Sequence, residues 1–383
     1  MRFVMLYHSL VSDWNHGNAH FLRGVARELL RRGHEVVVHE PADGWSRANL
    51  SADHGAAPLE RFATAYPDLQ GVSRTYQSAA SLDLDAALDG ADVVIVHEWT
   101  DPALVGRVGA HHARNPGPCT LLFHDTHHRA VTQPEALGAF DLSAYDGVLA
   151  FGGCLRDLYL ARGWARRAWT WHEAADTALF QPRVEQAEGD LVWVGNWGDD
   201  ERTAELHEFL IEPVRALGLR ARVYGVRYPE AARRALADAG IEYGGWLPNF
   251  DVPSVFARFR VTVHVPRRPY TEALPGIPTI RPFEALACGI PLVSAPWPDR
   301  ERLFAVGRDY LSARDGAEMR HQLQAVLEDR DLATRLSAHG RRTIAARHAC
   351  AHRVDQLFDI VAEILGEPGQ TVPSAPVLER VAS

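Results

Sequence analysis

Two successive alternations of apolar runs and amphipathic stretches constrain the fold of this chain of 383 residues more than any other feature. The first apolar run, Arg2–Tyr7, is followed by an amphipathic stretch at Ala19–Arg32, and Gly33 separates that stretch from another apolar run at Glu35–His39. Apolar residues spaced three and four apart predict a helix, and short apolar runs between turn residues predict buried strands. The pattern therefore predicts a βαβ unit, which belongs to a parallel sheet covered by helices.

The same alternation continues along the chain and begins again near residue 190. A polar segment that contains Pro and Gly, Phe180–Gly189, is the best candidate for a linker between the two halves. The further predicted strands are Asp92–His97, Thr120–His124, Tyr145–Phe151, Asp190–Gly195, Arg220–Gly225 and Val261–Val265. The further predicted helices are Cys154–Arg162, Arg202–Leu217, Glu230–Ala239, Gly316–Leu327, Leu332–Arg347 and His352–Leu365.

This organisation predicts an α/β protein built from two Rossmann-like α/β/α domains that face a central cleft. We expect the first domain at 1–180 and the second at 190–350. A final helix is expected at 351–366, and a loosely ordered tail is expected at 367–383, where Pro recurs.

The composition excludes several classes of protein. All 40 basic residues counted as Lys or Arg are Arg, so the chain has no lysine that could form a Schiff base with pyridoxal phosphate or complete a P-loop. The formal net charge of −9 argues against a general nucleic-acid binder. The four cysteines are scattered without Cys-x-x-Cys spacing, so we expect reduced, buried thiols and no structural zinc site.

No segment indicates association with a membrane. No apolar run approaches the roughly 18–20 residues that span a bilayer, and no basic amphipathic helix stands out. The first ten residues, MRFVMLYHSL, predict a short strand rather than a signal peptide. We therefore expect a cytoplasmic protein.

The segment Gly276–Pro298, GIPTIRPFEALACGIPLVSAPWP, carries the most specific motif. Thr279 is predicted to cap a short helix, and Gly289 is predicted to end it before a buried strand. A helix N-terminus offers unpaired N–H groups and a partial positive charge, which suit a diphosphate. Arg281 in the first turn would add charge, and Glu284 is left to bind sugar hydroxyls.

This segment resembles the donor-site signature of GT-B glycosyltransferases, in particular family 4 and its spore maturation protein-like branch. That signature is Glu-x7-Glu followed by Ala-x-Ala-Cys-Gly-x-Pro. Glu284 matches the second Glu, which in the family binds the donor ribose, whereas Gly276 stands where the first Glu would be. The resemblance implies a GT-B fold in which the helix at 351–366 crosses back to the first domain. It also implies transfer with retention of anomeric configuration, without a metal or a cofactor.

Two segments of the first half resemble the acceptor and sugar sites of family 4. The loop Ser9–His20 resembles the family loop that contacts the acceptor and the transferred sugar, which assigns that role to its residues His16, Gly17 and Asn18. The run that begins with His124 resembles the His-Asp motif beside the reacting sugar. His124 therefore takes the catalytic role and His127 is the second candidate, although a metal site and an ordinary polar loop are also compatible with this run. Glu98 ends a neighbouring strand and is expected to line the same cleft, where Trp99 either lines it too or simply packs.

The second half offers the residues expected to hold the donor. Gly195 and Asn196 form the turn after the first strand of that half, where GT-B enzymes place the diphosphate. Gly225 ends the next strand, and Leu247 lies in a segment that resembles the one where the family holds its base. Without lysine, the diphosphate needs arginine: the candidates are Arg202, Arg227, Arg267, Arg268 and Arg281. In the Pro-rich loop at 264–278, Tyr270, Thr271 and Glu272 are candidates for altered sugar contacts.

These observations predict a glycosyltransferase that moves a sugar from a nucleoside diphosphate sugar, such as a UDP-sugar, to a hydroxyl acceptor. The acceptor is a small molecule, a lipid or a polysaccharide, and the sequence does not say which. A nucleotide-sugar 2-epimerase of the same fold and a non-catalytic nucleotide-sugar-binding module are the alternatives. The oligomeric state and the donor base are not readable from the sequence.

Overall fold

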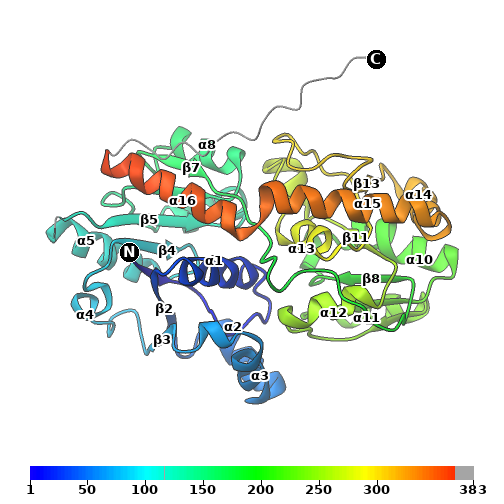
Figure 1. The fold of residues 1–383 in the computed structure, drawn as a ribbon, viewed down its shortest axis with the longest axis horizontal. Helices are drawn as coiled ribbons and strands as arrows, with labels where there is room; N and C mark the ends of the chain where they lie inside the picture. The colour runs from blue at the N-terminus through cyan, green and yellow to red at the C-terminus, as the bar shows by residue number, and fades with distance from the viewer. Residues whose placement is uncertain (116, 367–383) are drawn as a thin grey trace.

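The computed structural model describes residues 1–115 and 117–366, which form two lobes side by side (Figure 1). The tail predicted at 367–383 lies outside the described residues. In the first lobe, seven parallel strands form one sheet in the order β3-β2-β1-β4-β5-β6-β7. These strands are β1 Arg2–Leu6, β2 Glu35–Pro41, β3 Ser73–Tyr76, β4 Val93–His97, β5 Thr120–Asp125, β6 Gly147–Ala150 and β7 Ala168–Thr170.

The central strands of this sheet are buried on both faces. Every residue of β4 and of β5 is buried, as expected for a parallel sheet between two layers of helices. The helices of this lobe are α1 Ala19–Arg31, α2 Trp45–His54, α3 Ala57–Ala65, α4 Leu84–Leu88, α5 Pro102–Arg114, α6 Arg129–Thr132, α7 Pro134–Leu137 and α8 Gly153–Ala161.

The second lobe repeats the architecture with six parallel strands in the order β10-β9-β8-β11-β12-β13. The two parallel sheets with their helices confirm the predicted α/β fold class. The strands are β8 Leu191–Val194, β9 Ala221–Tyr224, β10 Ile241–Tyr243, β11 Val261–His264, β12 Leu292–Ser294 and β13 Leu311–Ser312. The helices are α9 Thr203–Leu206, α10 Glu212–Leu217, α11 Glu230–Asp238, α12 Val252–Ala257, α13 Ile280–Cys288, α14 Gly316–Glu328 and α15 Arg330–Thr343.

The helix predicted at Arg202–Leu217 is not continuous. A π-helical stretch, His207–Ile211, separates α9 from α10. Pro213 lies just after this stretch and has no N–H to donate to the preceding turn, which accounts for the irregular hydrogen bonding there. A second π-helical stretch, Ile344–His348, follows α15.

The last helix, α16 Cys350–Leu365, returns to the first lobe and packs against α1. Arg32 donates to Asp355 at 2.6 Å, and the indole N–H of Trp171 donates to the carbonyl of Arg353 at 2.8 Å. Figure 1 shows α15 and α16 following one another across both lobes. One hydrophobic cluster is continuous between the lobes, because it includes both Phe21 of α1 and Phe283 of α13.

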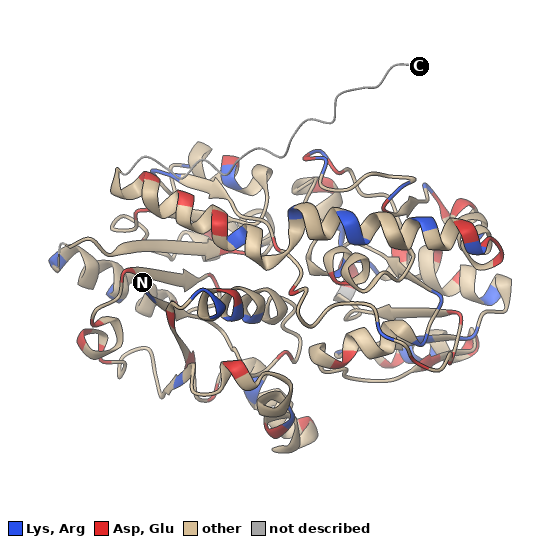
Figure 2. Cartoon of the chain, in the orientation of Figure 1, with Lys and Arg blue, Asp and Glu red and all other residues tan. Residues whose placement is uncertain are grey.

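The surface and the cysteines add little that is specific. Charged residues of both signs are interspersed over both lobes in the view of Figure 2. Among the described residues, no helix is both long enough and apolar enough to cross a bilayer. Cys288 and Cys350 are buried as expected, whereas Cys119 and Cys154 are only half-buried; none of the four forms a disulfide.

Candidate functional site

A cavity of about 630 Å³ lies between the two lobes. It is lined by segments that follow the carboxyl ends of parallel strands in both sheets. These are Asp13 and Asn15–Asn18 after β1, Trp99 after β4, Thr126–Arg129 after β5, Gly195 and Asn196 after β8, Gly225 and Arg227 after β9, and Val265–Arg267 after β11. Open α/β sheets bind ligands at this edge. The volume lies in the range of small-molecule sites.

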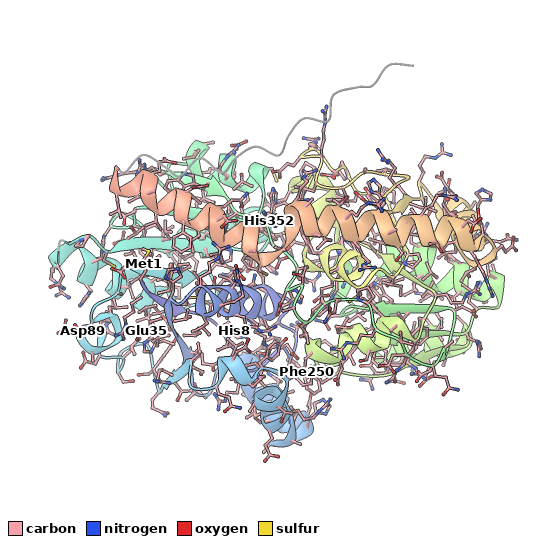
Figure 3. All side chains as sticks on the ribbon, in the orientation of Figure 1. Met1, His8, Glu35, Asp89, Phe250 and His352 are labelled. Carbon is pink, nitrogen blue, oxygen red and sulfur yellow. The ribbon has the colours of Figure 1, made fainter. Side chains whose placement is uncertain are left out.

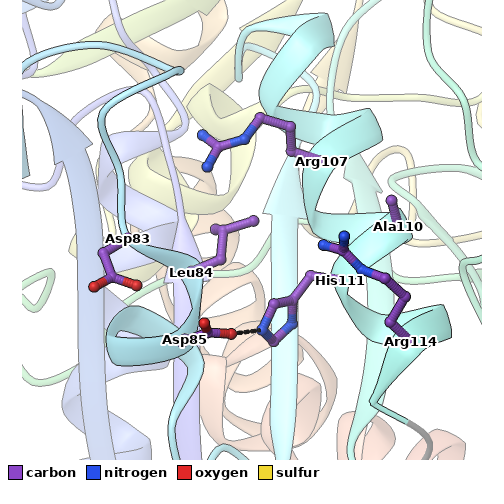
Figure 4. A pocket seen from close by; sticks show the side chains of 7 residues that line it. All are labelled: Asp83, Leu84, Asp85, Arg107, Ala110, His111 and Arg114. Carbon is purple, nitrogen blue, oxygen red and sulfur yellow. Dashed lines mark hydrogen bonds and ion pairs between the residues drawn. The ribbon is translucent and has the colours of Figure 1, made fainter.

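A second depression of about 450 Å³ lies on the outside of the first lobe, between α4 and α5 (Figure 4). Several of its polar side chains already have protein partners. His111 contacts Asp85 at 2.9 Å, and Arg107 donates to the backbone carbonyls of Ala79 and Leu82. The cavity between the lobes is therefore the candidate site.

The structure brings most of the sequence-predicted site residues into this cavity. Ten of them line it: His16, Gly17, Asn18, His127, Gly195, Asn196, Gly225, Leu247, Thr279 and Arg281. Three do not, because His124, Glu98 and Glu284 are fully buried behind the lining. Of the five arginine candidates, all but Arg268 line the cavity. Of the three candidates in the Pro-rich loop, Tyr270 lines it, whereas Thr271 and Glu272 do not.

The wall formed by the second lobe concentrates positive charge. Arg202 donates to the backbone carbonyls of Asn196, Trp197 and Val265, and no carboxylate lies within 4 Å of it among the described residues. Burial, followed by the charges of Arg267 and Arg281, lowers the pKa of Arg202 to about 9. Arg202 still carries its charge at neutral pH, and two further guanidinium groups of this wall, which pair with Glu201 and Glu284, lie close enough to affect it.

The N-terminus of α13 adds backbone donors to the same wall. The N–H groups of a first helical turn have no partner inside the helix. Thr279 occupies the N-cap position but makes no side-chain cap hydrogen bond, so the predicted cap is wrong in this respect. Its backbone, at φ 56° and ψ −178°, lies in a region that is essentially restricted to glycine. Gly289 ends the helix in the left-handed conformation, as predicted.

Strained backbone is concentrated at this cavity. Four residues other than glycine have positive φ among the described residues: Asn15, Arg227, Thr279 and Arg302. The first three line the cavity. Such conformations cost free energy and persist where the surrounding structure holds them, which is common at functional sites.

Glu284 ties the lobes together beneath the cavity. Its carboxylate accepts a hydrogen bond from Asn249 Nδ2 at 2.7 Å, pairs with Arg281, and lies 3.2 Å from Nδ1 of His20 in α1. Burial raises the pKa of Glu284, but Arg281, His20 and Asn249 together outweigh it and lower that pKa. The carboxylate is fully buried, so its predicted contact with a ribose requires one of these partners to move aside.

The wall formed by the first lobe contains several neutral rings, and its charged lining residues Asp13 and Arg129 are held in ion pairs with Arg23 and Glu98. His127 lines the cavity, and burial together with His128 and Arg267 lowers its pKa well below the ordinary value. His124 lies behind it, with Nδ1 2.6 Å from the hydroxyl of Tyr7. Burial lowers the pKa of His124 to about 3, so both imidazoles are neutral at pH 7. The structure therefore brings His127, and not His124, to the cavity.

Glu98 acts behind the same wall. It forms an ion pair with Arg129, whose guanidinium carbon lies 4.1 Å from the centre of the Trp99 ring. Burial and the neighbouring Asp125 raise the pKa of Glu98 to about 8. Arg129 and Trp99 line the cavity, so Glu98 orients a lining residue without reaching the cavity itself.

Among the lining residues that sequence reasoning missed, Glu173 is the one with an acidic side chain that lacks an ion pair within the described part of the chain. It lies between β7 and β8, is only 5% exposed, and one of its oxygens, Oε1, accepts a hydrogen bond from Asn18 at 3.3 Å. The other oxygen, Oε2, has no hydrogen-bond partner among the residues that the structure describes. Burial raises the pKa of Glu173 to about 8, with a smaller contribution from Glu284. The sequence feature that could have pointed to Glu173 is that it is the only acidic residue in the run Trp171–Ala175.

The other carboxyl groups of the cavity have partners. Asp13 pairs with Arg23 at 2.8 Å and accepts from the indole of Trp246 at 3.1 Å, while Glu201 pairs with Arg267 at 3.1 Å. Within the described residues, no group of three or more His, Cys, Asp or Glu side chains is placed to hold a metal ion.

Comparison with known proteins places this geometry in a fold family. Residues 202–359 match a family model described as glycosyl transferase-like. No curated protein sequence matches the chain.

The solved structures that it resembles cover nearly the whole chain. A glycosyltransferase from Rickettsia africae has 10% sequence identity and a TM-score of 0.65, covering 95% of this chain and 98% of that one. The sucrose-phosphate synthase of Thermosynechococcus elongatus has 15% identity and a TM-score of 0.64, covering 96% and 99%. The Anabaena protein HepE, solved with UDP and glucose, has 14% identity and a TM-score of 0.65, covering 94% and 99%. At these identities the likeness shows the fold alone, and it confirms the predicted GT-B fold.

Proposed function

We propose that this protein is a glycosyltransferase that moves a sugar from a nucleoside diphosphate sugar to a hydroxyl acceptor in the cavity between its lobes. The observation that carries the proposal is the cationic wall of the second lobe, where Arg202, Arg267 and Arg281 stand beside the N-terminus of α13. Guanidinium groups bind phosphate oxygens through paired, charge-assisted hydrogen bonds. A diphosphate bound there brings its sugar to the centre of the cavity.

The nucleoside belongs on the far side of this wall. Gly195, Asn196, Gly225 and Leu247 border the cavity there, and Asn196 already bridges the lobes through the side chain of Asn15. Glu284 is proposed to bind the ribose once Asn249 or His20 releases it. In that exchange a ribose hydroxyl replaces one hydrogen bond of the carboxylate with another, and the released side chain has to find a new partner.

The sugar would lie between Glu173 and His127. Glu173 is largely protonated at pH 7 because its pKa is about 8, so its free oxygen can donate to a sugar hydroxyl or accept from one. His127 is a neutral imidazole whose Nδ1 is buried and has no hydrogen-bond partner among the described residues. Both groups are therefore suited to orienting hydroxyl groups.

Retention of the anomeric configuration is supported by the state of the carboxyl groups. An inverting transfer needs a general base to take the proton of the acceptor, and the neutral imidazole of His127 is a weak one because its pKa is lowered well below the ordinary value. Asp13 and Glu201 are held in ion pairs, and Glu173 is mostly neutral. We propose instead that the acceptor attacks from the side of the leaving diphosphate, whose oxygen takes the proton. The three arginines would offset the diphosphate charge without a metal.

The test is calorimetry and thermal shift with UDP, GDP, dTDP and ADP and with their sugars. A ligand that binds only the folded state stabilises it in proportion to ln(1 + [L]/Kd). We expect one nucleotide to bind selectively, and Arg267→Ala to weaken it about tenfold or more. Arg268→Ala is the matched control, because its side chain is adjacent in sequence but outside the cavity. Absence of a shift with every nucleotide would exclude the proposed donor site.

Two further assays separate the alternatives. Incubation of the donor alone would yield an epimer if the protein is a nucleotide-sugar 2-epimerase. Binding without turnover on any acceptor would favour a non-catalytic module. Retention is read from the anomeric coupling constant of the product by NMR, and an inverted product would contradict the front-face mechanism. The assignment to family 4 and its spore maturation protein-like branch rests on the motif at Gly276–Pro298 and stays part of this proposal.

A further inference from the structure

Two exposed tryptophans stand at the mouth of the cavity, on the wall of the first lobe. Among the described residues, Trp45 and Trp99 are the only exposed aromatic side chains, at 46% and 45%, and both line the cavity. Exposed indoles are costly to keep in water, and a pair of them at one cavity is typical of a binding surface. Their placement opposite the cationic wall separates them from the proposed diphosphate site.

His8 joins the two tryptophans into one surface, which we call the acceptor platform: Trp45, His8 and Trp99. The His8 ring centre lies 6.4 Å from that of Trp45 and 6.3 Å from that of Trp99. Figure 3 labels His8 in the first lobe, near the boundary with the second. Burial lowers the pKa of His8 to about 4, so the platform carries a neutral imidazole that accepts a hydrogen bond at pH 7.

The orientation of the platform is fixed from below. Arg129 lies over one face of the Trp99 ring and is itself held by Glu98, and His127 meets the ring edge-on at 5.3 Å. Trp14 packs edge-on against Trp45 at 5.0 Å. Each indole is therefore supported on one side, which leaves its remaining surface to the cavity.

We infer that the acceptor is a carbohydrate whose pyranose ring stacks on this platform, an inference that rests on the proposed function. A pyranose presents a face of C–H groups to an aromatic ring while its hydroxyls project from the rim. The rim hydroxyls would meet His8 and Gln133, which also line the cavity from the first lobe. The stacking surface thus selects the ring, and the polar border selects its hydroxyl pattern.

The chemistry of the border argues against the other acceptor classes. An acyl chain needs a continuous apolar channel, whereas the platform is flanked by the guanidinium of Arg129 and by polar side chains. A nucleic acid would meet a chain with a formal net charge of −9. A flat phenol would stack, but it would leave the polar border without partners.

The experiment is saturation-transfer NMR with a panel of methyl pyranosides and maltose, in the presence of UDP. We expect at least one glycoside to receive saturation on its ring C–H protons. Trp99→Ala and Trp45→Ala should each weaken its apparent affinity about tenfold, and Trp99→Phe should retain most of it. Affinity for UDP, measured by calorimetry, should change less than about twofold in these variants.

Trp169→Phe is the control, since this indole is half-buried and outside the cavity. Thermal melts of each variant would show whether it folds. Binding of UDP with no glycoside bound, glycoside binding unaffected by both alanine variants, or Trp99-dependent binding of p-nitrophenol alone would each overturn the inference and leave the donor site intact. Failure of the unmodified protein to bind any of UDP, GDP, dTDP and ADP would instead overturn the proposed function, and this inference with it.

Discussion

The two walls of the cavity are built at the same edge of two similar sheets, yet they present opposite chemistry. The wall of the first lobe carries neutral rings, namely His8, Trp99 and His127, at the ends of β1, β4 and β5. The wall of the second lobe carries Arg202 and Arg267 after β8 and β11. The scaffold alone therefore does not decide which ligand a wall binds.

The contrast follows from how each side chain responds to burial. Desolvation disfavours the charged form, and an imidazole simply gives up its proton: the pKa of His8 falls to about 4. A guanidinium starts so high that Arg202, with a pKa lowered to about 9, keeps its charge. A buried arginine is therefore a permanent cation, suited to a diphosphate, whereas a buried histidine is a neutral partner for hydroxyl groups.

The largest expected effect comes from two glycines on opposite walls. A Cβ at Gly225 would lie 2.2 Å from the carbonyl oxygen of Gly195, and its φ of +155° disfavours other residues. A Cβ at Gly17 would meet only the side chain of Ile280, at 3.6 Å. We expect Gly225→Ala to lower the free energy of unfolding by about 3 kcal/mol or more, and Gly17→Ala to change it by about 0.5 kcal/mol or less. Urea titrations would measure both, and equal effects would contradict the difference in backbone packing.

The next largest effect is expected from breaking the ion pair between Arg281 and Glu284. Arg281→Ala leaves the buried carboxylate of Glu284 without its guanidinium. We expect a loss of about 2–3 kcal/mol in unfolding free energy, below the range for fully buried pairs because the Arg281 side chain is 31% exposed. Glu284→Gln in the same chain should restore part of this loss. A double variant no more stable than Arg281→Ala would show that the pair contributes little.

Local signals made much of this architecture predictable from the sequence. Gly289 ends α13 where a glycine is favoured, and apolar runs marked β1, β4, β5, β8 and β11 to within two residues at either end. The short strands β3, β7, β10 and β13 were not predicted as strands, because two to four residues at or near a sheet edge carry little periodicity. The π-helical stretch between α9 and α10 was not predicted, because the presence of Pro213 does not by itself show which turn of the helix will be irregular.

The site was harder to predict than the fold. The sequence placed His124 at a strand end, but both faces of β5 are buried, so alternation along the strand could not show that His127 rather than His124 reaches the cavity. Glu173 and Trp45 enter the cavity only because distant segments meet there. Glu284 matched a family motif, yet its burial depends on His20 and Asn249, which lie far away in sequence.

Glu173 lies where the two walls meet, and its pKa offers a test of their different environments. Its folded pKa of about 8 lies above the ordinary value of 4.5, so ionisation favours the unfolded chain. The stability that this group supports is complete below about pH 4.5 and is lost as the pH rises towards 8. Glu173→Gln should escape that loss, and we expect its advantage over the unmodified protein to grow by about 3 kcal/mol between pH 5 and pH 8.

Thermal melts at several pH values would measure this difference. Glu272→Gln is a control, because Glu272 is exposed and outside the cavity. A constant difference between Glu173→Gln and the unmodified protein would mean that Glu173 is already ionised at pH 5. Its role as a neutral group that orients a sugar hydroxyl would then fail, and a base for an inverting transfer would become the better assignment.

The smallest effect tests whether strain is part of the cationic wall. Thr279 holds a backbone conformation that suits glycine, whereas Asn15 on the opposite wall, at φ 49°, is a residue type that tolerates positive φ. Thr279→Gly should raise the free energy of unfolding by about 1 kcal/mol, since the relief of strain exceeds the added entropy of the unfolded chain. Asn15→Gly should not raise the free energy of unfolding. If the strain aims the first N–H groups of α13 at the diphosphate, Thr279→Gly should also weaken UDP binding by a factor of about 2–5. A more stable variant with unchanged UDP affinity would show that the strained turn is dispensable and that the arginines alone make this wall an anion site.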